Sequence, residues 1–274
     1  MKYLSTAIFT FGLSASAALA APVDLSTWTA ENGPSGPGGS SNGDWDLAVD
    51  NNSVTQGNNG RPTVFYDGAS SSQGTALSGS ITVNTTGDDD FVGFILGMDA
   101  GELDGTAATV DYWLVDWKQT NQTVSGNFGE AGLALTHVTA AATSQLNFWS
   151  HEGPGFDEVA RGTNLGSTGW DDLVEYTFEL VFTDSLIEIA VNGATELSYT
   201  SAQNGSSFED GGFGFYNYSQ QNVTYAGITE VILPDPDPDP DPNPNPSAVP
   251  FPAGLPLLLA GLGAFGVLRR KAKT

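Results

Sequence analysis

Residues 87–97 read Gly-Asp-Asp-Asp-Phe-Val-Gly-Phe-Ile-Leu-Gly, so three acidic residues run directly into an apolar segment. Adjacent carboxylates repel one another and lose hydration on burial, so a fold gathers them mainly where a cation neutralises their charge. Residues 91–96 are bulky and β-prone, and Gly93 within them predicts a buried strand with close backbone packing. This stretch therefore predicts a core strand of a β-sandwich with a calcium site at its entrance.

A second strand is predicted over residues 110–119, where side chains alternate between two faces. The alternation places Trp113, Val115 and Trp117 on one face, which we expect in the core, while the opposite face becomes polar towards its end. Further strands are predicted at 64–66, 79–83, 132–138, 146–149, 175–182, 187–191, 197–200, 212–218 and 223–231, with a type I′ hairpin turn at Asn192-Gly193. Regular strands, turn punctuation and no sustained helical period predict an all-β sandwich or barrel.

The charge of the chain is strongly acidic, with 32 acidic and 8 basic residues. Five of the basic residues lie in terminal segments that we expect to be removed, namely Lys2, Arg269, Arg270, Lys271 and Lys273. Such a surface repels phosphates, which argues against nucleic acid as a partner. It favours divalent cations, basic partners or solubility in salt. The chain has no cysteine, so it forms neither disulfides nor thiolate metal sites.

Both ends of the chain differ in composition from the middle. Residues 1–20 contain one lysine, an apolar stretch and a final Ala-Leu-Ala, which predicts a cleaved secretory signal peptide. Residues 234–248 contain a run of proline alternating with aspartate or asparagine, which is typical of a stiff polyproline II spacer. Residues 249–274 combine an apolar stretch with a basic end and are about long enough to cross a bilayer. The folded domain is therefore predicted over residues 21–233.

The C-terminal segment resembles a bacterial sorting signal. It reads Val-Pro-Phe-Pro-Ala at 249–253, continues with an apolar stretch over 254–268 and ends in basic residues. This order is similar to the VPLPA variant of the PEP-CTERM signals of Gram-negative bacteria, with Phe251 in place of leucine. The resemblance implies export through the inner membrane and transient membrane insertion of a single C-terminal hydrophobic helix. It also implies cutting by an exosortase-like processing enzyme; an ordinary single-span anchor is the alternative.

Four motifs in the middle of the chain also resemble a known family. They are Asp88-Asp89-Asp90-Phe91-Val92-Gly93-Phe94, Tyr112-Trp113-Leu114-Val115-Asp116-Trp117-Lys118-Gln119, Gly169-Trp170-Asp171-Asp172 and Gly212-Phe213-Gly214-Phe215-Tyr216-Asn217-Tyr218-Ser219-Gln220. Their order is similar to that of the thrombospondin C-terminal (lectin-like) domain family, although the link between the first two motifs is longer here. The resemblance implies a concanavalin A-like jelly-roll β-sandwich that binds calcium.

The candidate metal ligands are the carboxylates of Asp88, Asp89 and Asp90, with Asp116 or Asp172 joining from neighbouring loops. Calcium takes six to eight oxygen ligands, so one tripeptide cannot suffice alone. If the strand pattern already holds at the triplet, Asp89 points away from the other two; a solvated acidic turn is the alternative interpretation. A second site formed by three further aspartates is also considered, namely Asp44, Asp46 and Asp50.

Catalytic motifs are weak in this sequence. Glu175 and Glu179 share a face of one predicted strand, but four residues of strand separate them by roughly 13 Å, beyond the about 5 to 9.5 Å that glycosidases use. His151-Glu152-Gly153-Pro154 departs from the HExxH zinc motif. We expect an exported, non-catalytic, calcium-binding surface or extracellular-matrix module, with extracellular polysaccharide or matrix proteins as partners. A calcium-dependent carbohydrate-binding lectin and a glycoside hydrolase of the same fold are the alternatives.

Overall fold

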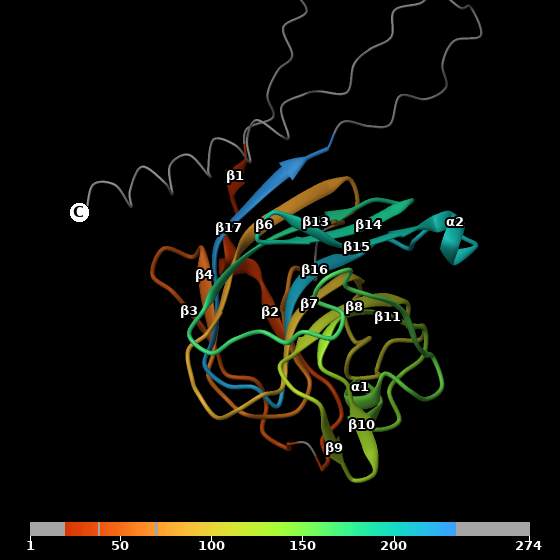
Figure 1. Cartoon of the computed structure of the whole chain (residues 1–274). Helices are drawn as coiled ribbons and strands as arrows, with labels where there is room; N and C mark the ends of the chain where they lie inside the picture. The colour runs from red at the N-terminus through yellow and green to blue at the C-terminus, as the bar shows by residue number, and fades with distance from the viewer. Residues whose placement is uncertain (1–19, 38, 69–70, 234–274) are drawn as a thin grey trace, which may run out of the picture. The chain divides into compact units, whose positions relative to one another are not determined.

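Two antiparallel β-sheets pack face to face in the computed structural model, which describes residues 20–37, 39–68 and 71–233 (Figure 1). The eight-stranded sheet contains, in spatial order, β15 (Ala194–Thr200), β14 (Leu186–Val191), β13 (Glu175–Phe182), β6 (Thr75–Val83), β17 (Val223–Ile232), β4 (Ser53–Gln56) and β3 (Trp45–Leu47), with β1 (Ala21–Pro22) beside β17. The seven-stranded sheet contains β12 (Phe156–Arg161), β11 (Gly132–Val138), β8 (Tyr112–Lys118), β7 (Phe91–Met98), β16 (Gly212–Tyr218), β5 (Thr63–Tyr66) and β2 (Thr29–Asn32). The predicted all-β sandwich is therefore confirmed.

A small ribbon and three short helices complete the described part of the chain. The ribbon pairs β9 (Gln122–Val124) with β10 (Asn127–Gly129), and the helices are η1 (Leu25–Thr27), α1 (Leu146–Ser150) and α2 (Ser201–Asn204). None of the described helices is long and apolar enough to cross a membrane. The predicted spacer (234–248) and sorting tail (249–274) lie outside the described residues, as does the signal peptide (1–20) except for its last residue.

The main core lies between the two sheets and follows the predicted alternation. From β8 it takes Trp113, Val115 and Trp117, and from β13 it takes Phe178, Leu180 and Phe182, all of them buried. Apolar side chains that alternate with polar ones can all face the opposing sheet, which is how a sandwich fills its interior.

Two local backbone predictions are also confirmed. Asn192 and Gly193 have φ values of 50° and 78°, which a type I′ turn between β14 and β15 requires. Gly93 on β7 pairs with Asp116 on β8, and a Cβ built at Gly93 would overlap the carbonyl oxygen of Val115. The glycine therefore permits the close approach of these two strands.

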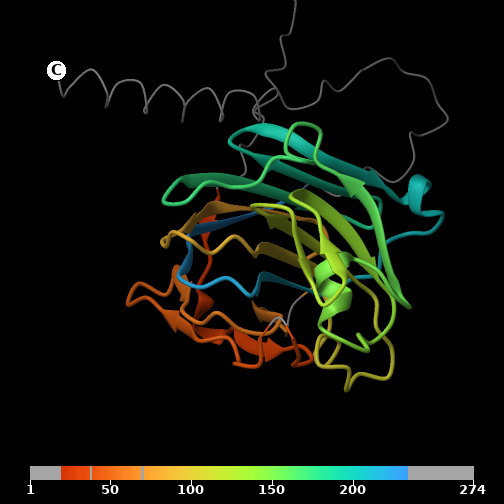
Figure 2. The ribbon, with the colours of Figure 1, turned by 60° about the horizontal axis from the view of Figure 1, so that its bottom comes forward.

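The outer face of the seven-stranded sheet carries a second core, although this face of β8 does end in the polar residues Asp116 and Lys118 as expected. Every residue of β7 and β8 is buried. Tyr112 and Leu114 pack there with Phe148 and Trp149 of α1. Figure 2 brings α1 and the β9–β10 ribbon to the front, over this sheet. Segments remote in sequence thus cover a face that strand alternation alone assigns to solvent.

The prediction of a strand at residues 146–149 is wrong, because this segment forms α1. Its neighbouring Phe148 and Trp149 are both buried, whereas a strand would point them to opposite faces. The helix ends at Ser150, and the following residue, His151, has a φ of 52° in the left-handed region. A four-residue apolar run does not distinguish a strand from a short buried helix by its periodicity.

Candidate functional site

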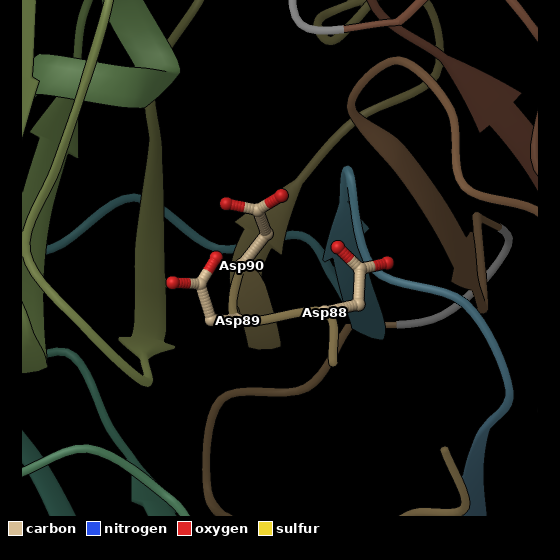
Figure 3. A group of neighbouring side chains, drawn as sticks. All are labelled: Asp88, Asp89 and Asp90. Carbon is tan, nitrogen blue, oxygen red and sulfur yellow. The ribbon is translucent and has the colours of Figure 1, made fainter. Parts of the chain in front are cut away.

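The aspartate triplet lies in the turn that enters β7. The strand begins at Phe91, so the alternation that would turn Asp89 away does not apply to the three preceding residues. One oxygen from each of Asp88, Asp89 and Asp90 lies within 4.8 Å of the others. The three carboxylates point to the same side of the backbone (Figure 3). The described residues therefore bring together three of the five predicted ligands.

Polar groups from three further loops surround the triplet. The Asn59 side chain donates to the Asp88 carboxylate at 2.7 Å, and the Thr120 hydroxyl donates to the Asp89 carboxylate. The Ser219 hydroxyl donates to the Asn59 side-chain oxygen at 3.2 Å. Asn59 follows β4, Thr120 follows β8 and Ser219 follows β16, so the triplet ties the entrance of β7 to the ends of three other strands.

Lys118 makes the ion pair that holds Asp90. Its Nζ lies 2.7 Å from the Asp90 carboxylate, and the two side chains are 0% and 6% exposed. The ammonium also donates to the Asp89 carbonyl oxygen at 3.1 Å and to the Gln122 side chain at 3.2 Å. It lies 4.6 Å from the centre of the Trp149 ring, a cation–π contact. A buried lysine is retained only with such a full set of partners.

The electrostatics of the triplet favour a bound cation. Burial, and then repulsion by Asp90, raise the pKa of Asp88 to about 6, although the hydrogen bond from Asn59 partly opposes the shift. Burial also raises the pKa of Asp90, and Lys118 offsets part of this effect. Within the described residues, Lys118 is the one basic side chain that forms an ion pair with the triplet. When all three aspartates are ionised, two negative charges therefore remain without a basic partner.

These residues fit a hard divalent cation. The groups around the triplet include carboxylate and hydroxyl oxygens, which are ligands that calcium prefers, while the Asn59 amide presents its nitrogen to Asp88. The two unpaired negative charges match the charge of one such ion. Asp90 is the weakest of the three candidates because the Lys118 ammonium already occupies one of its oxygens.

Asp116 and Asp172 do not join this group. The Asp116 carboxylate lies 2.9 Å from His151 Nε2, on the outer face of β8. Asp172 accepts a hydrogen bond from Gln119 at 3.4 Å. Among the described residues, the triplet alone brings three or more potential metal ligands together. Asp44, Asp46 and Asp50 therefore do not form a second cluster there. Ligation by any of these residues stays a prediction.

His151 is the centre of a charge network that the sequence analysis did not find. Its two ring nitrogens lie 2.9 Å from Asp116 and 2.7 Å from Glu158, and Glu158 in turn accepts two hydrogen bonds from Arg161. Burial alone would lower the pKa of His151, but Asp116 and Glu158 raise it to about 9. The imidazole is thus a cation at neutral pH. The sequence signal for such a network was the pair of charged residues, Asp116 and Lys118, in an otherwise apolar strand. Charged side chains at these positions require charged partners if the outer face of β8 is buried.

Two acidic side chains hold the backbone of the long link between β7 and β8, namely Glu102 from within the link and Glu31 from β2. Glu102 accepts from the backbone N–H groups of Asp99 and Asp111, both at 2.7 Å. Glu31 accepts from the N–H groups of Gly101 and Asp104, both at 2.9 Å. Without these carboxylates, the backbone N–H groups of the loop would lack hydrogen-bond partners. We therefore assign Glu31 and Glu102 a structural role.

The glutamates considered for glycoside hydrolysis lie on the outer face of the eight-stranded sheet. Glu175 and Glu179 belong to β13, which pairs in unbroken register with β6 over its whole length. Burial and then Glu188 raise the pKa of Glu179. Because a regular strand keeps the two carboxyl groups roughly 13 Å apart, this pair does not have the spacing of a glycosidase.

Comparisons with solved structures give only distant likenesses. The solved structures that resemble the chain include the carbohydrate-binding module CBM66 from Bacillus subtilis, at 11% identity and a TM-score of 0.47, covering 75% of this chain and 95% of that one. A glycoside hydrolase family 16 endo-glucanase from Bacteroides ovatus has 11% identity and a TM-score of 0.44, covering 76% and 97%. Likenesses at this level carry no information about ligands.

A relative and a family match are more specific. Thrombospondin-3b of Danio rerio is 26% identical over 167 residues, which are 57% of this chain and 17% of that protein. The chain thus matches a small part of that relative. The family described as the thrombospondin C-terminal region matches residues 40–231, from the segment before β3 to β17. We conclude that the chain belongs to the thrombospondin C-terminal region family.

Proposed function

We propose that this protein is an exported, non-catalytic binding module that calcium stabilises, and that it acts in adhesion or matrix binding. The observation that carries the calcium part is the convergence of the Asp88, Asp89 and Asp90 carboxylates within 4.8 Å, with one ion pair between them and Lys118. Membership of the thrombospondin C-terminal region family supports a binding module rather than an enzyme.

The ion would be held by Asp88 and Asp89, with Asp90 contributing the oxygen that Lys118 leaves free. Asn59, Thr120 and Ser219 would orient these carboxylates through the hydrogen bonds described above. Calcium supplies charge neutralisation, which relieves the repulsion that raises the pKa of Asp88. Because these residues follow different strands, neutralisation would fix one end of the sandwich and the loops that face a partner there.

Thermal melts with calcium, with chelator and with sodium at matched ionic strength test the proposal. At a hundredfold excess over the dissociation constant, binding to the folded state adds about 2.7 kcal/mol. For a domain of this size the melting temperature should rise by roughly 5 to 10 °C. Sodium should give a smaller rise, because screening does not replace coordination. Identical melts under the three conditions would leave the triplet as a solvated acidic turn.

The choice of variant matters here, because removing Asp90 leaves the buried Lys118 unpaired and destabilises the domain by itself. Asp88→Asn avoids this, because in the described part of the chain Asp88 hydrogen-bonds to the Asn59 amide and forms no ion pair. It should lose most of the calcium-dependent rise while melting normally in chelator. Asp50→Asn is the matched control, since Asp50 is exposed and its one side-chain hydrogen bond among the described residues is to the backbone of Asn52.

Export and anchoring form the second part of the proposal. The composition of residues 1–20 and 249–274 supports a secreted precursor whose tail an exosortase-like enzyme removes at the surface of a Gram-negative bacterium. Intact-mass analysis of the protein from its native host tests this. We expect a mass without residues 254–274, and a mass that retains them would favour an ordinary membrane anchor.

A further inference from the structure

A polar pocket of about 450 Å³ lies against the His151 network and shares no residue with the aspartate triplet. It opens between the β9–β10 ribbon, the end of α1 and strand β12. Its lining includes Phe128, Glu130, Trp149, Glu152, Glu158 and Arg161. Ligand pockets commonly have volumes of roughly 300 to 1,000 Å³. We propose that this pocket binds a saccharide whose hydroxyl or amino groups donate hydrogen bonds and which carries no anionic group.

The cations that line the pocket direct nearly all of their donors at protein acceptors. Four of the five N–H groups of Arg161 hydrogen-bond to Glu158 and to the carbonyl oxygens of Ala131 and Gly166, and the guanidinium also lies 3.5 Å from the Glu130 carboxylate. Both ring nitrogens of His151 are held by carboxylates. A phosphate, sulfate or uronate would therefore find few free charged donors in the pocket and would lie beside several carboxylates.

Acceptors are available in surplus. The Glu130 side chain is 50% exposed and meets Arg161 only at 3.5 Å, and Glu152 is exposed with no side-chain hydrogen bond within the described residues. Asn127 donates through its amide nitrogen to Ser125, which leaves its side-chain oxygen for a ligand. Hydroxyl and amino groups are the donors that such carboxylate and amide oxygens accept. The pocket thus selects a ligand rich in donors.

An exposed aromatic ring supplies the apolar surface. Phe128 lies in the β9–β10 ribbon and is 52% exposed, although it is large and apolar. Its ring can pack against the C–H face of a pyranose while neighbouring oxygens accept from the ring hydroxyls. Three carboxylates and two cations line the pocket, so the charges of its lining nearly balance. These features together favour a sugar over a basic peptide.

This inference rests on the proposed function as a binding module, but it does not need the calcium site. The test applies the full chain, with and without chelator, to an array of linear oligosaccharides that includes β-glucans, chitin and chitosan oligomers and uronate oligomers. Isothermal titration then measures the best ligand. We expect binding to neutral or amine-bearing oligomers, little to uronates, and the same affinity in chelator.

Two variants locate the site. Phe128→Ala should weaken binding about two- to tenfold, and Glu130→Gln about fivefold, without changing the melting temperature because both side chains are half exposed. Val49→Ala, at a fully exposed apolar residue next to β3, is the control and should bind like the wild type. The inference is overturned if no neutral or amine-bearing oligomer binds, if uronates bind best, or if both pocket variants keep wild-type affinity. Absence of calcium stabilisation with retained sugar binding would instead reject only the calcium proposal.

Discussion

Replacing Lys118 by methionine should destabilise the domain strongly and should make it depend more on calcium. Methionine keeps the apolar stem, but it removes the ammonium that lies 2.7 Å from Asp90 in a pair that is 0% and 6% exposed. Breaking a buried pair from one side costs about 3 to 5 kcal/mol, because the remaining charge loses its partner in a dry environment. At about 2 to 4 °C per kcal/mol, the melting temperature in chelator should fall by roughly 6 to 20 °C.

The same substitution raises the number of unpaired negative charges at the triplet from two to three. Calcium should therefore restore more stability to Lys118→Met than it adds to the wild type. The double variant Lys118→Met/Asp90→Asn removes both charges and should recover most of the loss in chelator. Thermal and urea unfolding of the three proteins, each with and without calcium, decide the matter. A loss below about 1 kcal/mol for the single variant, or no rescue in the double variant, would refute this account of the ion pair.

Two further predictions concern the sheet that carries the site. The pKa of His151 is raised to about 9 from 6.5, so the stability it contributes should be complete below pH 6.5 and lost as the pH rises through 9. This amounts to about 3 kcal/mol, and urea unfolding should show it in the wild type but not in His151→Gln; parallel pH curves would contradict the assignment. Gly93→Ala should destabilise by about 3 kcal/mol, since the new Cβ overlaps the Val115 carbonyl oxygen and forces β7 and β8 apart. A chemical denaturation midpoint equal to that of the wild type would show that the strands do not approach so closely.

The strands of the main core could be predicted from sequence because their pattern is local. Residues 132–138, 175–182 and 212–218 have the bounds that the alternation and the turn residues indicate. The short strands β3, β4, β9 and β10 were not predicted, since they have three or four residues each and little apolar character. Short strands of this kind form because neighbouring strands pair with them, and their own residues do not indicate which segment the partner will be.

At the site, too, adjacent residues could be predicted from the sequence, whereas partners far away in the chain could not. The three adjacent aspartates are visible in the sequence, and their common direction follows from β7 beginning one residue later. Their partners could not be predicted, because Asn59 lies 29 residues before Asp88 and Lys118 lies 28 residues after Asp90. The His151 network depends on α1 folding over the outer face of β8, which the strand prediction at 146–149 excluded.

The central claim is that the triplet binds one divalent cation, and a calcium titration of the chelator-treated protein by calorimetry tests it most directly. We predict one strong site per chain in the wild type, much weaker binding in Asp88→Asn and unchanged binding in Asp50→Asn. The claim would be contradicted if Asp88→Asn bound calcium as tightly as the wild type. It would also be contradicted if the wild type gave no heat above that of dilution.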